Sequence, residues 1–327
     1  MSRRYLNEMA IGAKVDEVFM IASKELRRTR TGDSFLLLNL SDRTGAVTAY
    51  RFEPTASEVE LPVGGFVRVE GRMGMYRGFR RLTLDSLEIV SRVDSADFLE
   101  RSVRPTDEMV SELRERVRGV SDRSIARVLR AAFADRAFFE RFCASPLGTS
   151  GPYAYVGGLL EHTLAVTASA ASLADHHTEI DADLLVGSAI VHDIGIVDAI
   201  VLDVVPRETD EGRLLGHTAL SDRRILDAAR RAGLKESDSR LLALRHAVAA
   251  HHGGSAGDPR SGHLKPSTIE AVALAGADQQ NLTLATFARE VSAAVRVDES
   301  WTGATNRFNR PLHSRPFIAI DTTAKSA

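Results

Sequence analysis

The hydrophobic period of this chain changes once, near Pro105, and that change limits the fold more than any other feature of the sequence. Before it, short runs rich in β-branched and aromatic residues alternate with turn residues, which is typical of β-strands. After it, apolar residues recur at helical spacing. The sequence therefore predicts a multidomain α+β protein, with an N-terminal β domain followed by an all-α domain.

Five strands are expected in the first part, over residues 15–24, 34–42, 46–52, 65–76 and 79–90. The breaks between them, such as Arg-Thr-Gly-Asp (30–33) and Arg-Gly (77–78), are good turn sequences. Five short strands in so short a segment favour a small five-stranded β-barrel of the OB type. We assign this nucleic-acid-binding domain to residues 11–93 and a polar linker to residues 94–105.

The second domain is expected over residues 106–315, with a C-terminal tail over 316–327. Its helical patterns cover residues 106–118, 121–134, 158–175, 182–193, 217–232, 238–252 and 266–292. Candidate capping residues stand at the ends of several of these segments, as at Asp122 and Gly233.

Composition narrows the setting of the protein. The net charge of -2 does not by itself indicate a nucleic-acid-binding protein, so that argument depends on local clusters. The single cysteine, Cys143, cannot form an intramolecular disulfide, and its apolar neighbours predict a small core residue. No apolar run approaches the roughly 18 residues that span a bilayer, and the start lacks the pattern of a secretory signal. We expect a cytoplasmic protein without a membrane partner.

Histidines and aspartates recur in order along the helical part, each among Leu, Ile, Val and Ala. A buried charge or imidazole without a partner costs several kcal/mol, and one or two divalent cations would offset several such costs together. Imidazole and carboxylate ligands suit Mn, Fe, Co, Ni or Zn, and the absence of a cysteine cluster argues against structural zinc. The ordered set is His162, His192, Asp193, His217, His251, His252 and Asp278.

The order of these residues resembles that of dinuclear HD-domain phosphohydrolases. The surrounding sequences resemble the YhaM-type 3′→5′ exoribonucleases over about residues 11–315, in Gly-Gly-Leu-Leu-Glu-His-Thr (157–163), His-Asp-Ile-Gly (192–195), Gly-Arg-Leu-Leu-Gly-His (212–217) and Ala-His-His-Gly (250–253). This resemblance implies a metal-dependent phosphodiesterase, a hydrolase that shortens single-stranded RNA, or single-stranded DNA, from the 3′ end and releases 5′-mononucleotides.

The resemblance also implies roles for individual residues. One metal would be held by His162, His192, Asp193 and Asp278, and a second by Asp193, His217, His251 and His252. Two ions are expected, with Mn²⁺ as the first choice and Mg²⁺, Co²⁺, Fe²⁺ or Ni²⁺ as alternatives. The expected catalytic residues are His192, Asp193 and His246.

Two positions qualify these roles. His246 lies about 140° around a helix axis from His251, so we place it near the substrate phosphate or behind the ligands. Ile196 stands where many HD domains have a lysine that can reach the substrate phosphate. Candidates to replace that charge are Arg207, Arg213 and Arg245.

An OB barrel binds single strands by stacking bases on aromatic rings while cations follow the backbone. Aromatic and basic residues are interleaved most densely in the hairpin around residues 76–81. Phe35 and Phe52 could instead face the barrel core. The expected nucleic-acid-binding residues are Tyr50, Phe52, Tyr76, Arg77, Phe79, Arg80 and Arg81.

Two other functions stay open at this point. The helical domain could hydrolyse a nucleotide or a cyclic dinucleotide, with the barrel as a docking module. Alternatively, the protein could bind nucleic acid without cleaving it, and Ile196 favours that alternative. A homo-oligomer is compatible with each function.

Overall fold

The computed structural model describes residues 3–29, 31–76, 79–94, 97–202, 206–253, 264–293, 301–304 and 306–313, with Phe79 and Ala293 described by their backbone alone. The chain divides into two compact units, Met1–Phe98 with Thr286–Ala327, and Leu99–Ala285. The domain bounds expected from the sequence stay a prediction, and each unit is described by itself.

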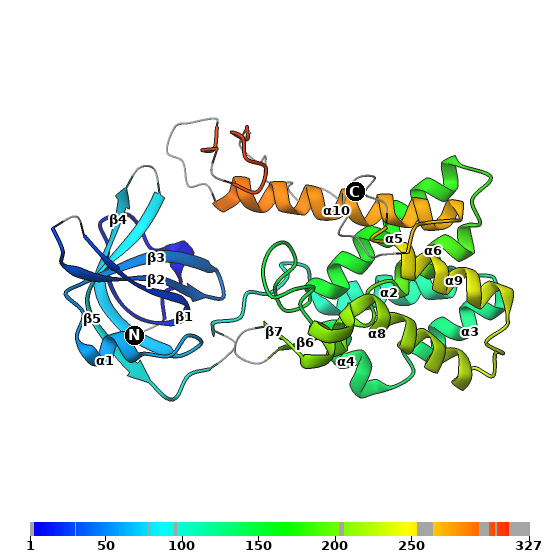
Figure 1. The fold of residues 1–327 in the computed structure, drawn as a ribbon, viewed down its shortest axis with the longest axis horizontal. Coiled ribbons are helices and arrows are strands. Elements are labelled where there is room, and N and C mark those ends of the chain that lie inside the picture. Colours follow the sequence, from blue (N-terminus) through cyan, green and yellow to red (C-terminus); the bar gives the residue numbers. More distant parts are fainter. Residues whose placement is uncertain are drawn as a thin grey trace, which may run out of the picture. The chain divides into compact units, whose positions relative to one another are not determined.

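The first unit contains a closed barrel of five strands with the order β1-β2-β3-β5-β4 (Figure 1). The β1 strand also pairs with β4, which closes the barrel, and only the β3–β5 pairing is parallel. The predicted OB-type barrel is therefore confirmed. Its strands are β1 (Lys14–Arg28), β2 (Ser34–Asp42), β3 (Gly45–Phe52), β4 (Phe66–Tyr76) and β5 (Phe79–Val90), with a short helix α1 (Ala56–Glu60) between β3 and β4.

Side-chain alternation divides each strand into an inner and an outer face. Leu36, Leu38 and Leu40 of β2 point into the barrel and are fully buried. Tyr50 and Phe52 of β3 point outward, because they alternate with the buried Val47 and Ala49. The barrel core is thus mainly aliphatic, with Phe19 of β1 as a buried aromatic residue, and the aromatic residues of β3 remain on its surface.

The second unit is helical apart from one small hairpin of β6 (Ile200–Leu202) and β7 (Pro206–Glu208). The predicted all-α character is confirmed, while the hairpin was not predicted. Its helices are α2 (Thr106–Gly119), α3 (Arg123–Ala132), α4 (Arg136–Ala144), α5 (Gly158–His176), α6 (Ala182–Val191), α7 (Ile196–Ala199), α8 (Asp210–Arg231), α9 (Ser239–Ala250) and α10 (Ile269–Ala293), the last of which crosses the boundary between the units.

Aspartate side chains cap several of these helices. Asp122, Asp181 and Asp238 each accept a backbone N–H at the start of α3, α6 and α9, which satisfies donors that the helix itself leaves unpaired. The Arg240 guanidinium donates to the carboxylates of both Asp122 and Asp181. One side chain of α9 thereby ties together the first turns of α3 and α6.

The α8 helix begins earlier than the sequence pattern indicated. The pattern predicted a helix from residue 217, whereas α8 starts at Asp210 and bends at Gly216, whose φ of 75° lies in the left-handed region. Glycine adopts that conformation without strain, so the helix changes direction immediately before His217. The α4 helix was also missed. None of the described helices is both long enough and apolar enough to cross a bilayer.

Candidate metal centre

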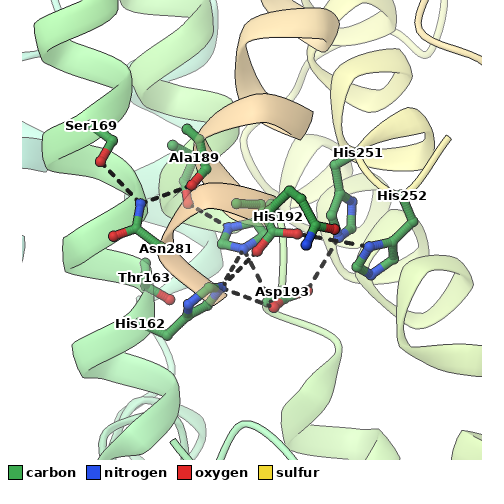
Figure 2. A network of polar contacts seen from close by, with 12 residues as sticks. His162, Thr163, Ser169, Ala189, His192, Asp193, His251, His252 and Asn281 are labelled. Atoms are coloured by element: carbon green, nitrogen blue, oxygen red, sulfur yellow. Dashed lines mark hydrogen bonds and ion pairs between the residues drawn. The ribbon is translucent and has the colours of Figure 1, made fainter. Parts of the chain in front are cut away.

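The predicted ligand residues come together in the helical unit, although they are spread over five helical segments. His162 lies in the second turn of α5, and His192 and Asp193 follow the last residue of α6. Figure 2 shows His162, His192 and Asp193 pointing toward one another, with His251 and His252 beside them. His217 follows the bend in α8, the two adjacent histidines follow α9, and Asp278 lies on α10.

Asp193 stands at the middle of this cluster. Its Oδ2 lies 3.3 Å from His192 Nε2 and 3.7 Å from His162 Nε2. Its Oδ1 lies 3.4 Å from His217 Nε2 and 3.5 Å from His251 Nε2. Each carboxylate oxygen therefore faces a different pair of imidazoles, as a carboxylate bridging two neighbouring cations would.

Among the residues that the structure describes, two groups offer ligand atoms close enough to hold an ion. The first group is His162, His192 and Asp193. In this group and in the second, the ligand atoms lie within 4.8 Å of one another. The second group combines Asp193 with His217, His251 and His252. Asp278 lies beside the first group, since its Oδ1 is 3.1 Å from His162 Nε2.

Backbone carbonyls determine which ring nitrogen can act as a ligand. His192 Nδ1 donates to Ala189 O at 2.8 Å, and His251 Nδ1 donates to Val248 O at 2.5 Å. In the neutral rings this leaves a lone pair on each Nε2, the atom that faces Asp193. The α6 and α9 carbonyls thus hold both histidines in the tautomer that binds a metal through Nε2.

The Nε2 lone pairs of His192 and His251 face the lone pairs of the Asp193 carboxylate. Within the cluster, four buried polar atoms have no hydrogen-bond partner among the described residues, namely His162 Nδ1, Asp193 Oδ1, His251 Nε2 and Asp278 Oδ1. The last three face other ligand atoms of the cluster, whereas His162 faces it through Nε2. Buried acceptors that converge without donors are strongly destabilising unless a cation or extra protons lie between them. Imidazole and carboxylate ligands match a first-row divalent metal, so the cluster fits divalent-metal binding.

The electrostatics of the cluster favour a positive charge beside Asp193, which a proton on His192 supplies until a metal displaces it. Burial opposes ionisation of Asp193, yet the neighbouring His192 holds the pKa of that carboxyl well below its usual value. Burial also opposes a charge on His192, but the Asp193 carboxylate raises its pKa to about 9. Burial lowers the pKa of His217, and burial together with His251 lowers that of His252 to about 3. His217 and His252 are therefore neutral and able to bind a metal at physiological pH.

His246 and the arginines occupy less central places. His246 Nε2 accepts a hydrogen bond from Ser267 N at 2.9 Å, and His246 belongs to neither potential ligand group. Arg245 forms a paired hydrogen bond with the carboxylate of Asp222. His246 thus stands outside both groups, and its role near the phosphate or behind the ligands stays a prediction.

A pocket of about 450 Å³ adjoins the cluster and is lined in part by Asp193, His217 and His252. Ile196, the first residue of α7, forms part of its wall and is 5% exposed. Glu208 and the segment 147–150 also line it. Glu208 was not predicted as a site residue, since no local sequence pattern marks the end of a short hairpin as part of a pocket.

On the barrel, the Phe35, Tyr50 and Phe52 rings lie 5.9 to 6.5 Å apart between centroids. Phe52 is 47% exposed and Tyr76 is 52% exposed, so neither belongs to the barrel core. The Arg81 guanidinium lies 5.0 Å from the Tyr76 ring centroid and 5.9 Å from that of Tyr50.

Three other residues were expected to bind nucleic acid, namely Arg77, Phe79 and Arg80. Arg80 donates to Leu6 O and Met9 O, so its guanidinium holds the N-terminal segment. Arg77 lies outside the described residues, and Phe79 is described only as the backbone partner of Tyr76.

Comparison with known proteins agrees with this site. The model of the HD domain family matches residues 159–280, which include all seven predicted ligands. Residues 159–280 therefore form a helical HD domain, and the HD domain is a metal-dependent phosphohydrolase domain.

Within that class, the chain is similar to the YhaM 3′-5′ exoribonucleases. It is 29% identical to the Bacillus subtilis protein over 264 residues, which cover 79% of this chain and 83% of the relative. It is also 29% identical to the Bacillus pumilus protein over 266 residues, again 79% of this chain and 83% of the relative. The resemblance to the YhaM-type proteins is thus confirmed over about four-fifths of the chain.

Solved structures are similar to part of the chain. The second OB-fold domain of replication protein A from Methanococcus maripaludis covers 28% of this chain and 99% of that domain, at 15% identity and a TM-score of 0.24. The assignment of the barrel rests on its own strand order and closure.

Proposed function

We propose that this protein is a metal-dependent 3′→5′ exoribonuclease that hydrolyses single-stranded RNA to 5′-mononucleotides. One observation carries the proposal, namely that the two oxygens of Asp193 face two different pairs of histidines at 3.3 to 3.7 Å. The similarity to the YhaM 3′-5′ exoribonucleases supports the reaction and its direction.

The two potential ligand groups support two ions that share Asp193. His162, His192, Asp193 and Asp278 would hold one, and Asp193, His217, His251 and His252 the other. We propose Mn²⁺ as the ion, because it accepts both imidazole and carboxylate ligands. A pair of bound cations lowers the pKa of a water molecule and stabilises the attacking and leaving oxygens of an in-line displacement.

The residues of the chain orient and shield this chemistry. Asp193 stays ionised in a buried setting, and the carbonyls of Ala189 and Val248 keep His192 and His251 from rotating. The adjoining pocket provides room for the end of the substrate. No nucleophilic side chain is required, since water attacks the phosphodiester.

We propose that the barrel holds the single strand on Tyr50, Phe52, Tyr76 and Arg81. Exposed aromatic rings near a guanidinium can stack successive bases while the cation pairs with phosphate. Arg77 and Phe79 stay in the proposal as predictions from the sequence, whereas the contacts of Arg80 to the N-terminal segment favour a structural role. RNA as substrate and a lone buried cysteine fit a cytoplasmic enzyme.

A double variant tests the catalytic proposal. We expect the purified protein with Mn²⁺ to shorten a 5′-labelled single-stranded RNA from its 3′ end, and His192→Ala/Asp193→Ala to lose both activity and bound metal. The matched control is His176→Ala, which changes an exposed histidine at the end of α5 and should retain both. Intact RNA with the metal-loaded native protein would refute the proposal.

One observation favours a second function. Ile196 places a neutral side chain in the pocket, where many HD domains have a lysine. If the metal-loaded protein binds RNA tightly and never cleaves it, the protein is a nucleic-acid-binding protein that has kept its metal centre.

A further inference from the structure

The pocket beside the metal cluster has an unusual charge for a site next to a phosphate. Among the described residues that line it, the charged side chains are Asp193 and Glu208, and neither lysine nor arginine is present. A site for several phosphates would instead be expected to carry basic side chains. Whatever occupies this pocket next to the scissile phosphate is therefore uncharged.

The shape and surface of the pocket fit one nucleoside. Its volume of about 450 Å³ lies within the range of small-ligand sites. Ile196, Ile200 and Leu282 line it with apolar surface suited to a base, while the hydroxyls of Thr149 and Ser150 are available to a sugar. Ile200 and Glu208 are paired across the β6–β7 hairpin, so the carboxylate lies beside the apolar wall.

We infer that this pocket holds the 3′-terminal nucleoside of the RNA and selects ends with a free 3′-hydroxyl over ends with a 3′-phosphate. The inference rests on the proposed function, because the scissile phosphate must lie at the metal cluster. Hydrolysis leaves that phosphate on the 5′ oxygen of the terminal nucleoside, so the nucleoside occupies the adjoining pocket. Its ribose hydroxyls can then donate to the Glu208 carboxylate.

A 3′-phosphate would bring between about 1.5 and 2 negative charges into a pocket that already contains a carboxylate. Ile196 adds no charge to offset this. Arg213 Nε lies 3.6 Å from Glu208 Oε2, but both side chains are more than half exposed and Arg213 does not line the pocket. Solvent weakens such a pair, so Arg213 reduces the repulsion without removing it.

The first experiment compares RNAs that differ only at the 3′ end. We expect the native protein to degrade a 5′-labelled RNA with a 3′-hydroxyl about tenfold faster than the same RNA with a 3′-phosphate. Glu208→Gln should narrow this ratio several-fold. The matched control is Glu211→Gln, which removes the same charge in the first turn of α8. Because Glu211 lines a different pocket, this variant should keep the native ratio.

The second experiment measures binding without turnover. By titration calorimetry with Mn²⁺, adenosine 5′-monophosphate should bind more tightly than adenosine 3′,5′-bisphosphate, and Glu208→Gln should reduce that preference. Ile196→Lys should reduce it further, with circular dichroism to check that the variant is folded. Equal or tighter binding of the bisphosphate by the native protein overturns the inference, whatever the nuclease assay shows. If the native protein shows the expected binding selectivity but does not cleave RNA, only the proposed function is refuted.

Discussion

Substitution of Gly195 by alanine should separate the His-Asp motif from α8. Gly195 follows the motif directly, and its N–H donates to Ser221 Oγ at 2.9 Å. An added Cβ would lie 2.3 Å from Ser221 N, 2.5 Å from His217 O and 2.6 Å from Leu220 C. These three atoms belong to the α8 backbone, so no side-chain rotation can relieve the clash.

The expected cost follows from these distances. Ordinary van der Waals contact begins at 3.4 Å, so the α8 backbone must retreat by about 1.1 Å around Ser221. Overpacking of this kind costs about 3 kcal/mol. For a unit of this size, that loss lowers the melting temperature by about 6 to 12 °C. The same movement takes His217 away from Asp193, so metal affinity should fall as well.

Urea denaturation of metal-free protein measures the stability loss, and Mn²⁺ titration measures the loss of affinity. The control is Gly276→Ala in α10, where an added Cβ meets no atom within 4 Å. Because alanine favours helix over glycine, the control should gain up to about 1 kcal/mol. If Gly195→Ala unfolds at the native urea concentration and keeps its metal affinity, the close approach of the motif to α8 is wrong.

Three further predictions concern other parts of the chain. Burial raises the pKa of the Cys143 thiol to about 11. Iodoacetamide at pH 8 should therefore react with this thiol only when the protein is unfolded in urea. Rapid labelling of the folded protein would contradict the place of Cys143 in the core. Arg240 lowers the pKa of Asp181, so the pair contributes its full stabilisation above the unfolded carboxyl pKa of about 3.9. This contribution is lost progressively as pH falls from that value through the lower pKa of the folded state. Arg240→Leu should therefore be less stable than the native protein at pH 7, with the gap narrowing toward pH 3 in urea titrations. Phe52→Ala should weaken single-stranded RNA binding by about 1 to 3 kcal/mol and leave the stability of the barrel unchanged. Leu38→Ala should instead destabilise the barrel by about 2 to 5 kcal/mol. The reverse pattern in binding and unfolding assays would place Phe52 in the core.

Much of the fold was predictable because local patterns encode it. The strand β2 was predicted with its observed ends, Ser34–Asp42, since alternating leucines between two turns leave one face for burial. The α6 helix was predicted over residues 182–193; it begins at Ala182 as predicted and ends two residues early, at Val191, immediately before the His-Asp pair. The bend at Gly216 was not predicted, because only its φ of 75° shows that this glycine turns α8.

The candidate site, like the fold, was predictable from the sequence only in part. The sequence by itself determined which side chains could bind a metal, because imidazoles and carboxylates set among apolar helical residues need a partner when they are buried. It also determined the two domain types, since hydrophobic period depends on residues only a few positions apart.

Only the tertiary structure decided how these parts combine. It placed each oxygen of Asp193 between different histidines, set the ring orientation of His192 through the Ala189 carbonyl, and brought Glu208 to the pocket that Ile196 lines. Such contacts join residues far apart in the chain, and they depend on how closely helices can approach, as at Gly195. Helix packing acts between whole surfaces, so the spacing of residues along one segment cannot specify it.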